Sequence, residues 1–497
     1  MTTLKLISSA NNDPLVLGLG QRDGKLIIAS ATSDLLSAAE RRWLLTTLVD
    51  LGATGKVDEV TKVPFHSPRM LVFTGFGGEI TAPTHETLRR AAGSAARHLD
   101  GQKSATFSLP HRSIEELAAI AEGAAIGAYG FHDFRVDSKS EHQLPLSNIS
   151  ILSPLNTPAA KQAIKRAALI AKRTHLVRDL VNTPPSHLTP INFSTRMKKE
   201  ASALNVKVEI MSAATLKAKG YGGITSVGAG SANPPSLLRI SYSPVGAKKR
   251  IAFVGKGITF DTGGLNLKPF LGMEAMKSDM GGAAAVIAAV LVIAELKLPI
   301  AIDGWAAMAE NMVSSTATRP GDIITIYGGK TVEVLNPDAE GRLVLADAMV
   351  RAQEVGKAAG NLVGLVDVAT LTGAQGIALG KRVSAIMTNN PDFQEIFRQA
   401  AAESGENFWP MPLPEELRPT LDSPVADMAN IGERMGGMLV AGLFLREFVS
   451  DQLPWLHLDI AKPGYNADEP YGYTAFGGTG VALRSLVRLA ELVSSQN

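Results

Sequence analysis

Cysteine is absent from the 497 residues of this chain. Its absence excludes disulfide bonds, thiolate metal sites, iron–sulfur clusters and a cysteine nucleophile. A chain without cysteine is compatible with a reducing compartment, and we expect a cytoplasmic protein.

An excess of charge of one sign is absent too. Lysine and arginine together number 49, and aspartate and glutamate 47, so the formal net charge is only +2. No overall basic field favours nucleic acid or an anionic membrane as a partner.

Long hydrophobic runs are also missing. The first 13 residues contain no sustained apolar segment, so we expect no signal peptide. The longest uncharged apolar run, residues 280–294, is shorter than a membrane span and opens with small residues. It predicts a buried, closely packed helix, and we expect no association with a membrane.

The residues that are present describe a globular protein of more than one domain. Hydrophobic residues make up 45% and charged ones 19%, and 497 residues exceed one ordinary core. We predict an N-terminal α/β domain over 1–155, a connecting helix over 156–183 and a C-terminal catalytic domain over 184–497. The connecting helix is basic and rich in alanine. A solvated connector is the favoured interpretation and a nucleic-acid face the alternative.

Strand-like and helix-like segments alternate through both predicted domains. Beyond residue 190 the strands are nearly continuous apolar runs, which is typical of a mostly parallel sheet with helices on both faces. The predicted fold class is therefore α/β, with a smaller N-terminal α/β domain and a larger catalytic domain built on such a sheet. In sheets of this kind, ligands bind outside the carboxyl ends of the strands.

The stretch from 250 to 282 concentrates charge beside apolar elements. A short apolar strand runs into Lys256, and Asp261, Lys268 and Asp279 follow among several glycines. Burying such charges is costly unless something pairs them. Glycine lets the backbone approach closely, so these charges can converge on one point. We interpret this point as a metal site.

A second acidic stretch follows a predicted strand and contains Asp338, Glu340 and Arg342. If this segment is extended, the period of two points all three side chains to one side. A solvated turn carrying a surface ion pair is the alternative. Together with Asp261 and Asp279, the stretch supplies four carboxylates, which are enough to bind two divalent ions with one bridging carboxylate.

The chemistry of these side chains predicts hydrolysis of an acyl bond. Carboxylate-rich ligation suits Mn²⁺ or Mg²⁺, and Zn²⁺ accepts it too. Lys256 can join only as the neutral amine, which a nearby dication favours. Two such ions would activate a bridging water and polarise a carbonyl. Lys268 would stabilise the developing oxyanion, and Arg342 would clamp an anion next to the attacked carbon.

Several motifs occur in order along the chain and carry a family resemblance. They are N-T-P at 182–184, V-G-K-G-x-T-F-D-x-G-G at 254–264, M-K-x-D-M-x-G at 276–282, N-x-D-A-E-G-R-L at 336–343, V-A-T-L-T-G-A at 368–374 and W-L-H-L-D-I-A at 455–461. Together they resemble the leucyl (cytosol) aminopeptidase family over roughly residues 175–480, and their joint occurrence is highly specific. The resemblance implies a dinuclear metallo-exopeptidase that releases N-terminal residues, with leucine-type preference, from peptides.

The resemblance also implies a role for each matching residue. The implied ligands are Asp261, Asp338 and Glu340 for one metal, and Lys256, Asp261, Asp279 and Glu340 for the other. Lys268 and Arg342 would be the catalytic pair, with Arg342 holding a bicarbonate that serves as general base. The backbone carbonyl of Leu371 would face the substrate amine. The family assembles as a hexamer whose active sites open to an interior cavity, so we expect a homohexamer.

Neighbouring residues complete the predicted site. Met276, together with Met273 and Met280, is predicted to line the pocket for the first substrate side chain, and filling of the core is the alternative. Thr370 is predicted to form part of the pocket wall. Pro337 stands where threonine is common in the family, and it cannot donate a backbone hydrogen bond.

Two further functions stay open beside the aminopeptidase. One is a hexameric scaffold or DNA-binding protein whose peptidase site is vestigial, against which the complete set of ligands argues. The other is a narrow dipeptidase, for example one that hydrolyses Cys-Gly, which the motifs do not separate from a broad aminopeptidase.

Overall fold

The chain folds into two compact units. The computed structural model describes residues 2–65, 70–79 and 82–496. Unit 1 comprises Met1–His175 with Ala467–Phe476, and unit 2 comprises Leu176–Asn466 with Gly477–Asn497. The division falls within α4 (Pro158–Asn182). The structure thus places Ala467–Phe476 in unit 1, although the predicted catalytic domain included that segment.

Unit 1 is built on a seven-stranded sheet in the order β1-β7-β6-β2-β5-β4, with β3 paired to β2. Its strands are β1 (Thr3–Ile7), β2 (Leu15–Arg22), β3 (Lys25–Ala29), β4 (Val60–Pro64), β5 (Met70–Glu79), β6 (Ser104–Ser108) and β7 (Asn148–Leu152). Its helices are α1 (Ala38–Asp50), α2 (His85–Arg97) and α3 (Ile114–Gly127), with short 3₁₀ turns η1 (Ser33–Leu35) and η2 (Asp137–Glu141).

Alternation along β2 divides the core of unit 1 between the two faces of its sheet. Leu15 and Leu17 pack in one cluster with Leu44 of α1. Val16, between them, packs in another cluster that contains residues of α2 and α3. Successive side chains of a strand point to opposite faces, so helices cover this sheet on both sides.

Unit 2 contains an eight-stranded sheet in the order β16-β15-β18-β14-β10-β11-β9-β8. Its strands are β8 (Lys207–Ser212), β9 (Ser236–Tyr242), β10 (Arg250–Asp261), β11 (Ala301–Asn311), β14 (Leu362–Ala369), β15 (Ser384–Thr388), β16 (Phe408–Pro410) and β18 (Trp455–Asp459). The four central strands, β18, β14, β10 and β11, run parallel. Antiparallel pairs lie to either side of them. The predicted α/β class and mostly parallel sheet are confirmed.

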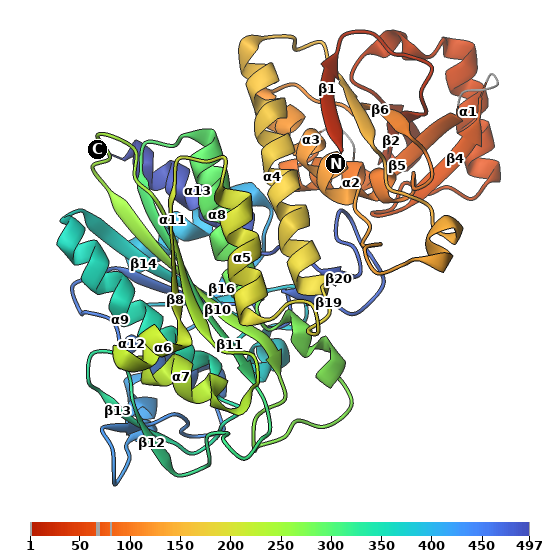
Figure 1. Cartoon of the computed structure of the whole chain (residues 1–497). Helices are drawn as coiled ribbons and strands as arrows, with labels where there is room; N and C mark the ends of the chain where they lie inside the picture. The colour runs from red at the N-terminus through yellow and green to blue at the C-terminus, as the bar shows by residue number, and fades with distance from the viewer. Residues whose placement is uncertain (1, 66–69, 80–81, 497) are drawn as a thin grey trace. The chain divides into compact units, whose positions relative to one another are not determined.

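Two long helices cover opposite faces of this central sheet, α8 (Gly281–Leu296) and α9 (Gly341–Ala359) (Figure 1). Ala252 and Val254 of β10 pack in one cluster with residues of α9. Gly255, of opposite parity, faces α8, because a Cβ there would lie 2.4 Å from the Cα of Ala283. The glycine therefore lets α8 approach β10 closely.

Apolar composition makes α8 a core helix. Its residues from Gly281 to Ala294 are all buried, as the sequence predicted. The stretch Met273–Leu296 is long and apolar enough to cross a membrane, but 89% of its most apolar window is buried inside the protein.

The remaining elements of unit 2 surround this frame. The helices are α5 (Pro190–Ala201), α6 (Ala213–Ala218), α7 (Gly222–Val227), α10 (Gly373–Leu379), α11 (Pro391–Ser404), α12 (Gly437–Arg446) and α13 (Leu483–Ser495), with 3₁₀ turns η3 (Gly228–Gly230), η4 (Met273–Ser278) and η5 (Glu415–Leu421). A second sheet contains β12 (Asp322–Thr325), β13 (Thr331–Val334) and β17 (Met428–Ala429), and a two-stranded ribbon contains β19 (Tyr465–Asn466) and β20 (Gly477–Gly478). The second acidic stretch follows β13 directly.

Candidate metal centre

The carboxyl-terminal half of β10 supplies the first two charged groups of the site. β10 lies between β14 and β11, and both Lys256 and Asp261 on it are buried. Nζ of Lys256 lies 2.8 Å from Oδ2 of Asp279 and 2.8 Å from Oε1 of Glu340. It also donates a hydrogen bond of 3.0 Å to the carbonyl oxygen of Thr370. One lysine thus joins segments that are far apart in the sequence.

Asp279 is positioned by the approach of α8 to the sheet. It lies between η4 and α8 and is buried. Its Oδ1 accepts hydrogen bonds from Nζ of Lys256 at 2.8 Å and from the hydroxyl of Thr370 at 2.7 Å. A Cβ at Gly282 would lie 2.1 Å from the carbonyl oxygen of Val368, so the glycine permits the packing that brings Asp279 here.

The loop after β13 supplies the other two carboxylates. Asp338 and Glu340 offer ligand oxygens that, with one of Asp261, all lie within 4.8 Å of one another. Nζ of Lys268 lies 2.8 Å from Oδ2 of Asp261 and forms a short ion pair with Asp338. The structure therefore brings all four predicted carboxylates and both predicted lysines into one cluster.

The segment 338–342 is not extended, although an extended conformation was the one considered from the sequence. Glu340 has φ −78° and ψ −34° and forms the N-cap of α9, so Arg342 already lies in the first helical turn. The period of two does not apply to such a turn. The alternative of a fully solvated turn is also wrong, since Glu340 and Arg342 are buried.

Burial and mutual repulsion raise the pKa values of Asp279, Asp338 and Glu340 in this cluster. Burial raises the pKa of Asp279 to about 6, and burial and the charge of Asp261 raise that of Glu340 to about 8. Burial also raises the pKa of Asp338, although Lys268 opposes it. Four carboxylates face only two ammonium groups, so the cluster has a deficit of positive charge.

The pKa values of the two lysines are also raised, but here the neighbouring carboxylates raise them and burial opposes the shift. Burial lowers the pKa of Lys256, but the carboxylates of Asp279, Glu340 and Asp261 outweigh it and raise that pKa above its ordinary value. Burial likewise lowers the pKa of Lys268, and Asp261, Glu340 and Asp338 raise it above the ordinary value. The charged ammonium form of both side chains is therefore favoured.

The donor set fits divalent cations. Among the described residues, Oδ2 of Asp279 and Oε1 of Glu340 are buried and accept no hydrogen bond, although each lies 2.8 Å from Nζ of Lys256. Buried oxygens of this kind are costly unless a cation or a donor satisfies them. Carboxylate oxygens are ligands for Mn²⁺, Mg²⁺ and Zn²⁺.

Arg342 lies beside the acidic cluster in a buried position. Its Nη1 donates a 2.7 Å hydrogen bond to the carbonyl oxygen of Asn430, and its guanidinium carbon lies 5.7 Å from the ring centroid of Phe444. Its Nε is buried and, among the described residues, makes no hydrogen bond. Burial lowers the pKa of Arg342 to about 10, which leaves it charged at neutral pH.

The predicted pocket residues occupy two places. Thr370 contacts Lys256 and Asp279 directly, at the end of β14. Leu371 follows, and its N–H donates to Oδ1 of Asp459 at 3.1 Å. Met276 lies half-buried in η4, three residues before Asp279.

Met280 differs from Met276 and fills the core, since its side chain is fully buried. Met273, at the start of η4, is half-buried like Met276. The alternative of core filling therefore holds for Met280.

Asn311 is a site residue that no sequence motif predicted. It ends β11, where the register pairs it with Asp261 on β10. Its Nδ2 donates to Oδ1 of Asp261 at 2.8 Å and to the carbonyl oxygen of Pro337 at 3.1 Å. One carboxamide thus ties the two acidic segments together. Its place at a strand end next to β10 was the only signal available.

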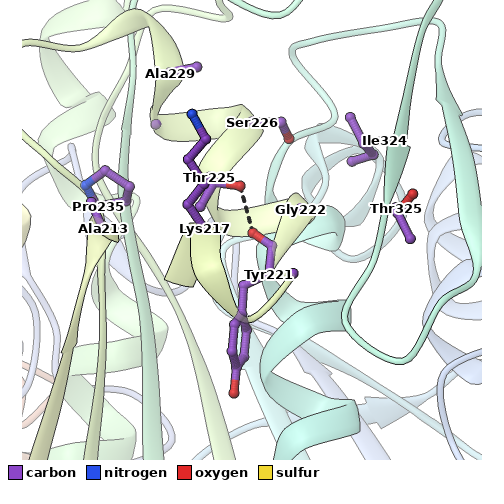
Figure 2. Close-up of a pocket in the computed structure, with 12 residues that line it drawn as sticks. Ala213, Lys217, Tyr221, Gly222, Thr225, Ser226, Ala229, Pro235, Ile324 and Thr325 are labelled. Atoms are coloured by element: carbon purple, nitrogen blue, oxygen red, sulfur yellow. Dashed lines mark hydrogen bonds between the residues drawn. The ribbon is translucent and has the colours of Figure 1, made fainter. Parts of the chain in front are cut away.

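Unit 2 also contains a cavity of about 600 Å³ that is lined by residues of α6, α7 and β12, among them Lys217 and Tyr221. Figure 2 shows the hydroxyl of Thr225 donating to the carbonyl oxygen of Tyr221, at 2.7 Å. None of the predicted site residues lines this cavity. The charged cluster, and not this cavity, is therefore the candidate for chemistry.

Family models match both parts of the chain. The model described as "Cytosol aminopeptidase family, catalytic domain" matches residues 175–487, and "Cytosol aminopeptidase family, N-terminal domain" matches residues 16–138. Among relatives, a probable cytosol aminopeptidase of Streptomyces avermitilis is 46% identical over 100% of this chain and 99% of its own length. One of Streptomyces coelicolor is also 46% identical over the same shares of the two chains.

Solved structures are similar over nearly the whole chain. The bottromycin maturation enzyme BotP in complex with Mn has a TM-score of 0.85 and 34% identity, covering 98% of this chain and 100% of its own. A mutant of tomato leucine aminopeptidase has a TM-score of 0.86 and 30% identity, covering 99% of this chain and 96% of its own.

Proposed function

The chain belongs to the cytosol aminopeptidase family of metal-dependent peptidases, and on that premise we propose that it is a dinuclear aminopeptidase that releases N-terminal residues, leucine among them, from peptides. The observation that carries the proposal is the convergence of four carboxylates from separate segments around two buried or half-buried lysines. Mn²⁺ or Zn²⁺ are the proposed ions, with Mg²⁺ as a further candidate.

The proposed ligand sets follow the family pattern. Asp261, Asp338 and Glu340 would hold one ion, and Lys256, Asp261, Asp279 and Glu340 the other. When bound, such a pair of ions supplies an activated water and polarises the carbonyl that is attacked. Lys256 would have to release its proton to become a ligand, which a neighbouring dication favours by repelling the ammonium form.

Lys268 is the proposed oxyanion donor. Its side chain is one-fifth exposed, whereas that of Lys256 is 4% exposed, so Lys268 faces the accessible side of the cluster. Its raised pKa keeps the ammonium charged, and a charged donor aimed at a developing oxyanion acts mainly in the transition state.

Arg342 is the proposed holder of a bicarbonate base. The group keeps its charge at neutral pH, and Nε lies buried without a hydrogen bond among the described residues. A guanidinium can bind a planar anion through two parallel N–H donors. Arg342 would hold the bicarbonate beside the cluster, where the anion would supply a general base.

The substrate would bind beside the segment after β14. We propose that the carbonyl of Leu371 accepts a hydrogen bond from the substrate amine, and that Thr370 and Met276 contribute to the wall around the first side chain. Asp459 holds the N–H of Leu371 and the hydroxyl of Thr372, which fixes the backbone of this segment.

The proposed setting is a homohexamer in the cytoplasm that acts on peptides. Support comes from the resemblance for the hexamer and from the names of the relatives for the compartment. The net charge of +2 supports neither nucleic acid nor an anionic membrane as a partner.

Chelation tests the proposal. EDTA should abolish hydrolysis of Leu-p-nitroanilide, and Mn²⁺ should restore it in wild-type protein but not in Asp338→Ala. Activity that survives the chelator would contradict the proposal. A DNA affinity that falls with salt and survives Asp338→Ala would favour the scaffold instead.

A substrate panel separates the narrow dipeptidase from the broad aminopeptidase. Leucyl peptides of two to five residues should all be cleaved with comparable kcat/KM. Cleavage confined to Cys-Gly and similar dipeptides would favour the narrow enzyme.

A further inference from the structure

Asn430 makes four side-chain hydrogen bonds to the loop that carries Asp338 and Glu340. Its Oδ1 accepts from the N–H groups of Leu335 at 2.8 Å and Asn336 at 3.2 Å. Its Nδ2 donates to the carbonyl oxygens of Asn336 at 2.7 Å and Ala339 at 3.4 Å. The carboxamide therefore lies within the turn of this loop and binds its backbone on both sides.

The parallel pairing of β17 with β13 explains how a segment so distant in sequence reaches the loop. Glu333 pairs with Ala429, and the N–H of Asn430 donates to the carbonyl oxygen of Glu333 at 2.9 Å. This register places Asn430 next to the first residues after β13. The second sheet of unit 2 thus sets the position of the acidic loop.

The backbone of Asn430 also holds Arg342. Its carbonyl oxygen accepts the hydrogen bond of 2.7 Å from Nη1 of Arg342. A single residue therefore contacts the peptide between the two carboxylates, through the carbonyl of Ala339, and the guanidinium that follows them.

The hydrogen-bonding capacity of this side chain is fully used. An asparagine carboxamide has two acceptor lone pairs and two N–H donors, and all four are engaged with backbone groups. The side chain is also completely buried. It consequently has no group left to touch a metal ion or a substrate, and any effect on catalysis must act through the loop and Arg342.

We infer that Asn430 is a positioning residue of the proposed aminopeptidase site, which sets Asp338 and Glu340 for metal binding and holds the guanidinium of Arg342. The inference rests on the proposed function. Groups that orient metal ligands affect metal affinity or activity by about 10–100-fold when they are removed. Asn430 acts on two ligands and on a proposed catalytic side chain at once.

Asn430→Ala tests the inference by equilibrium dialysis against Mn²⁺ and by steady-state kinetics with Leu-p-nitroanilide. The affinity for Mn²⁺ should fall about 10–100-fold, since both loop carboxylates lose their support. At saturating Mn²⁺, kcat should stay at least about tenfold lower, because Arg342 has lost its anchor and small misplacements of catalytic groups are costly. Mn²⁺ affinity and kcat that both stay within about twofold of wild type would overturn the inference.

Asn389→Ala is the matched control. This asparagine also bridges two segments of unit 2, accepting from the N–H of Trp455 at 2.9 Å and donating to the carbonyl of Leu453 at 3.0 Å. It directly follows β15 and lies beside the start of β18, at the end of the strands opposite the carboxyl-terminal strand ends that form the site. Its loss should lower the melting temperature while Mn²⁺ affinity and kcat stay within about twofold of wild type.

Asn430→Asp keeps the test decisive if the alanine variant does not fold. The aspartate keeps the size of the side chain but presents an acceptor to the carbonyl oxygens of Asn336 and Ala339. The same loss of Mn²⁺ affinity is expected, and an unchanged affinity would overturn the inference. Wild-type protein that binds Mn²⁺ without releasing leucine from peptides would contradict the proposed function, while the affinities of the variants would still decide the role of Asn430.

Discussion

Lys256 and Lys268 carry the same functional group in one cluster but differ in their access to solvent. The side chain of Lys256 is 4% exposed and lies among Asp279, Glu340 and Asp261, whereas that of Lys268 is 20% exposed. The first is enclosed by carboxylates that a metal would also bind, so it is suited to be a ligand. The second borders the open side, so it is suited to meet a substrate.

Replacing Lys268 by alanine separates these two roles. We expect kcat for Leu-p-nitroanilide to fall about 10²–10³-fold, the usual effect of losing one oxyanion donor. Metal content, measured by atomic emission after dialysis, should stay at the wild-type level. Lys217→Ala, at the rim of the separate cavity, should leave both values unchanged. Loss of metal in Lys268→Ala would mean that this lysine is a ligand or a support for one.

Asp100 in unit 1 provides a pH-dependent prediction that is independent of the metal centre. Burial raises its pKa to about 6, although Arg97 and Lys62 oppose this. Its Oδ1 is buried and makes no hydrogen bond among the described residues. Because the folded pKa exceeds the ordinary value of 3.8, the folded state binds the extra proton between about pH 4 and pH 6. Its contribution to the free energy of unfolding is therefore present below about pH 4 and lost as the pH rises through 6.

The substitution Asp100→Asn should remove the decrease in the free energy of unfolding that wild-type protein shows as the pH rises through 6. After allowance for partial exposure of the side chain, we expect the variant to be more stable than wild type by about 1–2 kcal/mol at pH 8, with the difference vanishing near pH 4. Urea denaturation across that pH range measures it. The exposed Asp133→Asn is the control and should show no such trend. Equal stability of Asp100→Asn and wild type at pH 8 would show that the carboxylate is solvated.

At the scale of elements, the site depends on how closely α8 and α9 approach the central sheet. Gly255 and Gly282 remove the side chains that would hold α8 away, and Glu340 begins α9 where the acidic loop ends. The helices thus set the positions of Asp279 and Glu340.

Gly255→Ala tests this close approach. The added Cβ would lie 2.4 Å from the Cα of Ala283, so α8 must move. Overpacking of this kind costs about 1–3 kcal/mol of the free energy of unfolding, and we also expect weaker binding of Mn²⁺ because Asp279 precedes α8. Urea denaturation and dialysis against Mn²⁺ measure the two effects. Gly437→Ala, where a Cβ meets no atom within 4 Å, should change stability by less than about 0.5 kcal/mol.

The charged residues that converge could be singled out from the sequence, because all of them except Lys268 occur in the specific motifs and Lys268 lies between two of these motifs. The residues that hold these charged side chains in place were not predictable from the sequence. Asn311 contacts Asp261 across 50 residues of chain and Asn430 contacts the acidic loop across about 94, and both contacts depend on strand register. The conformation of the acidic loop was not predicted either. An extended segment with a side-chain period of two was considered, but the loop leads directly into the first turn of α9.

At the scale of the whole molecule, each of the two units contains hydrophobic clusters of its own. The clusters around Leu15 and Val16 stabilise unit 1, and the cluster around Ala252 stabilises unit 2. The proposed metal ligands all belong to unit 2. A ligand that binds only the folded state stabilises the part of the chain that binds it.

Calorimetry with and without Mn²⁺ should therefore report on one unit alone. We expect two unfolding transitions, and only the transition temperature of unit 2 should rise with Mn²⁺. When the free ion is at 100 times its dissociation constant, the free energy of unfolding of unit 2 should increase by about 2.7 kcal/mol. Asp100→Asn at pH 8 marks the transition of unit 1, and Gly255→Ala marks that of unit 2. Asp338→Ala should abolish the Mn²⁺-dependent rise and leave the transition of unit 1 in place. A rise of both transitions by equal amounts would mean that the units unfold as one, and no rise at all would contradict metal binding by the acidic cluster.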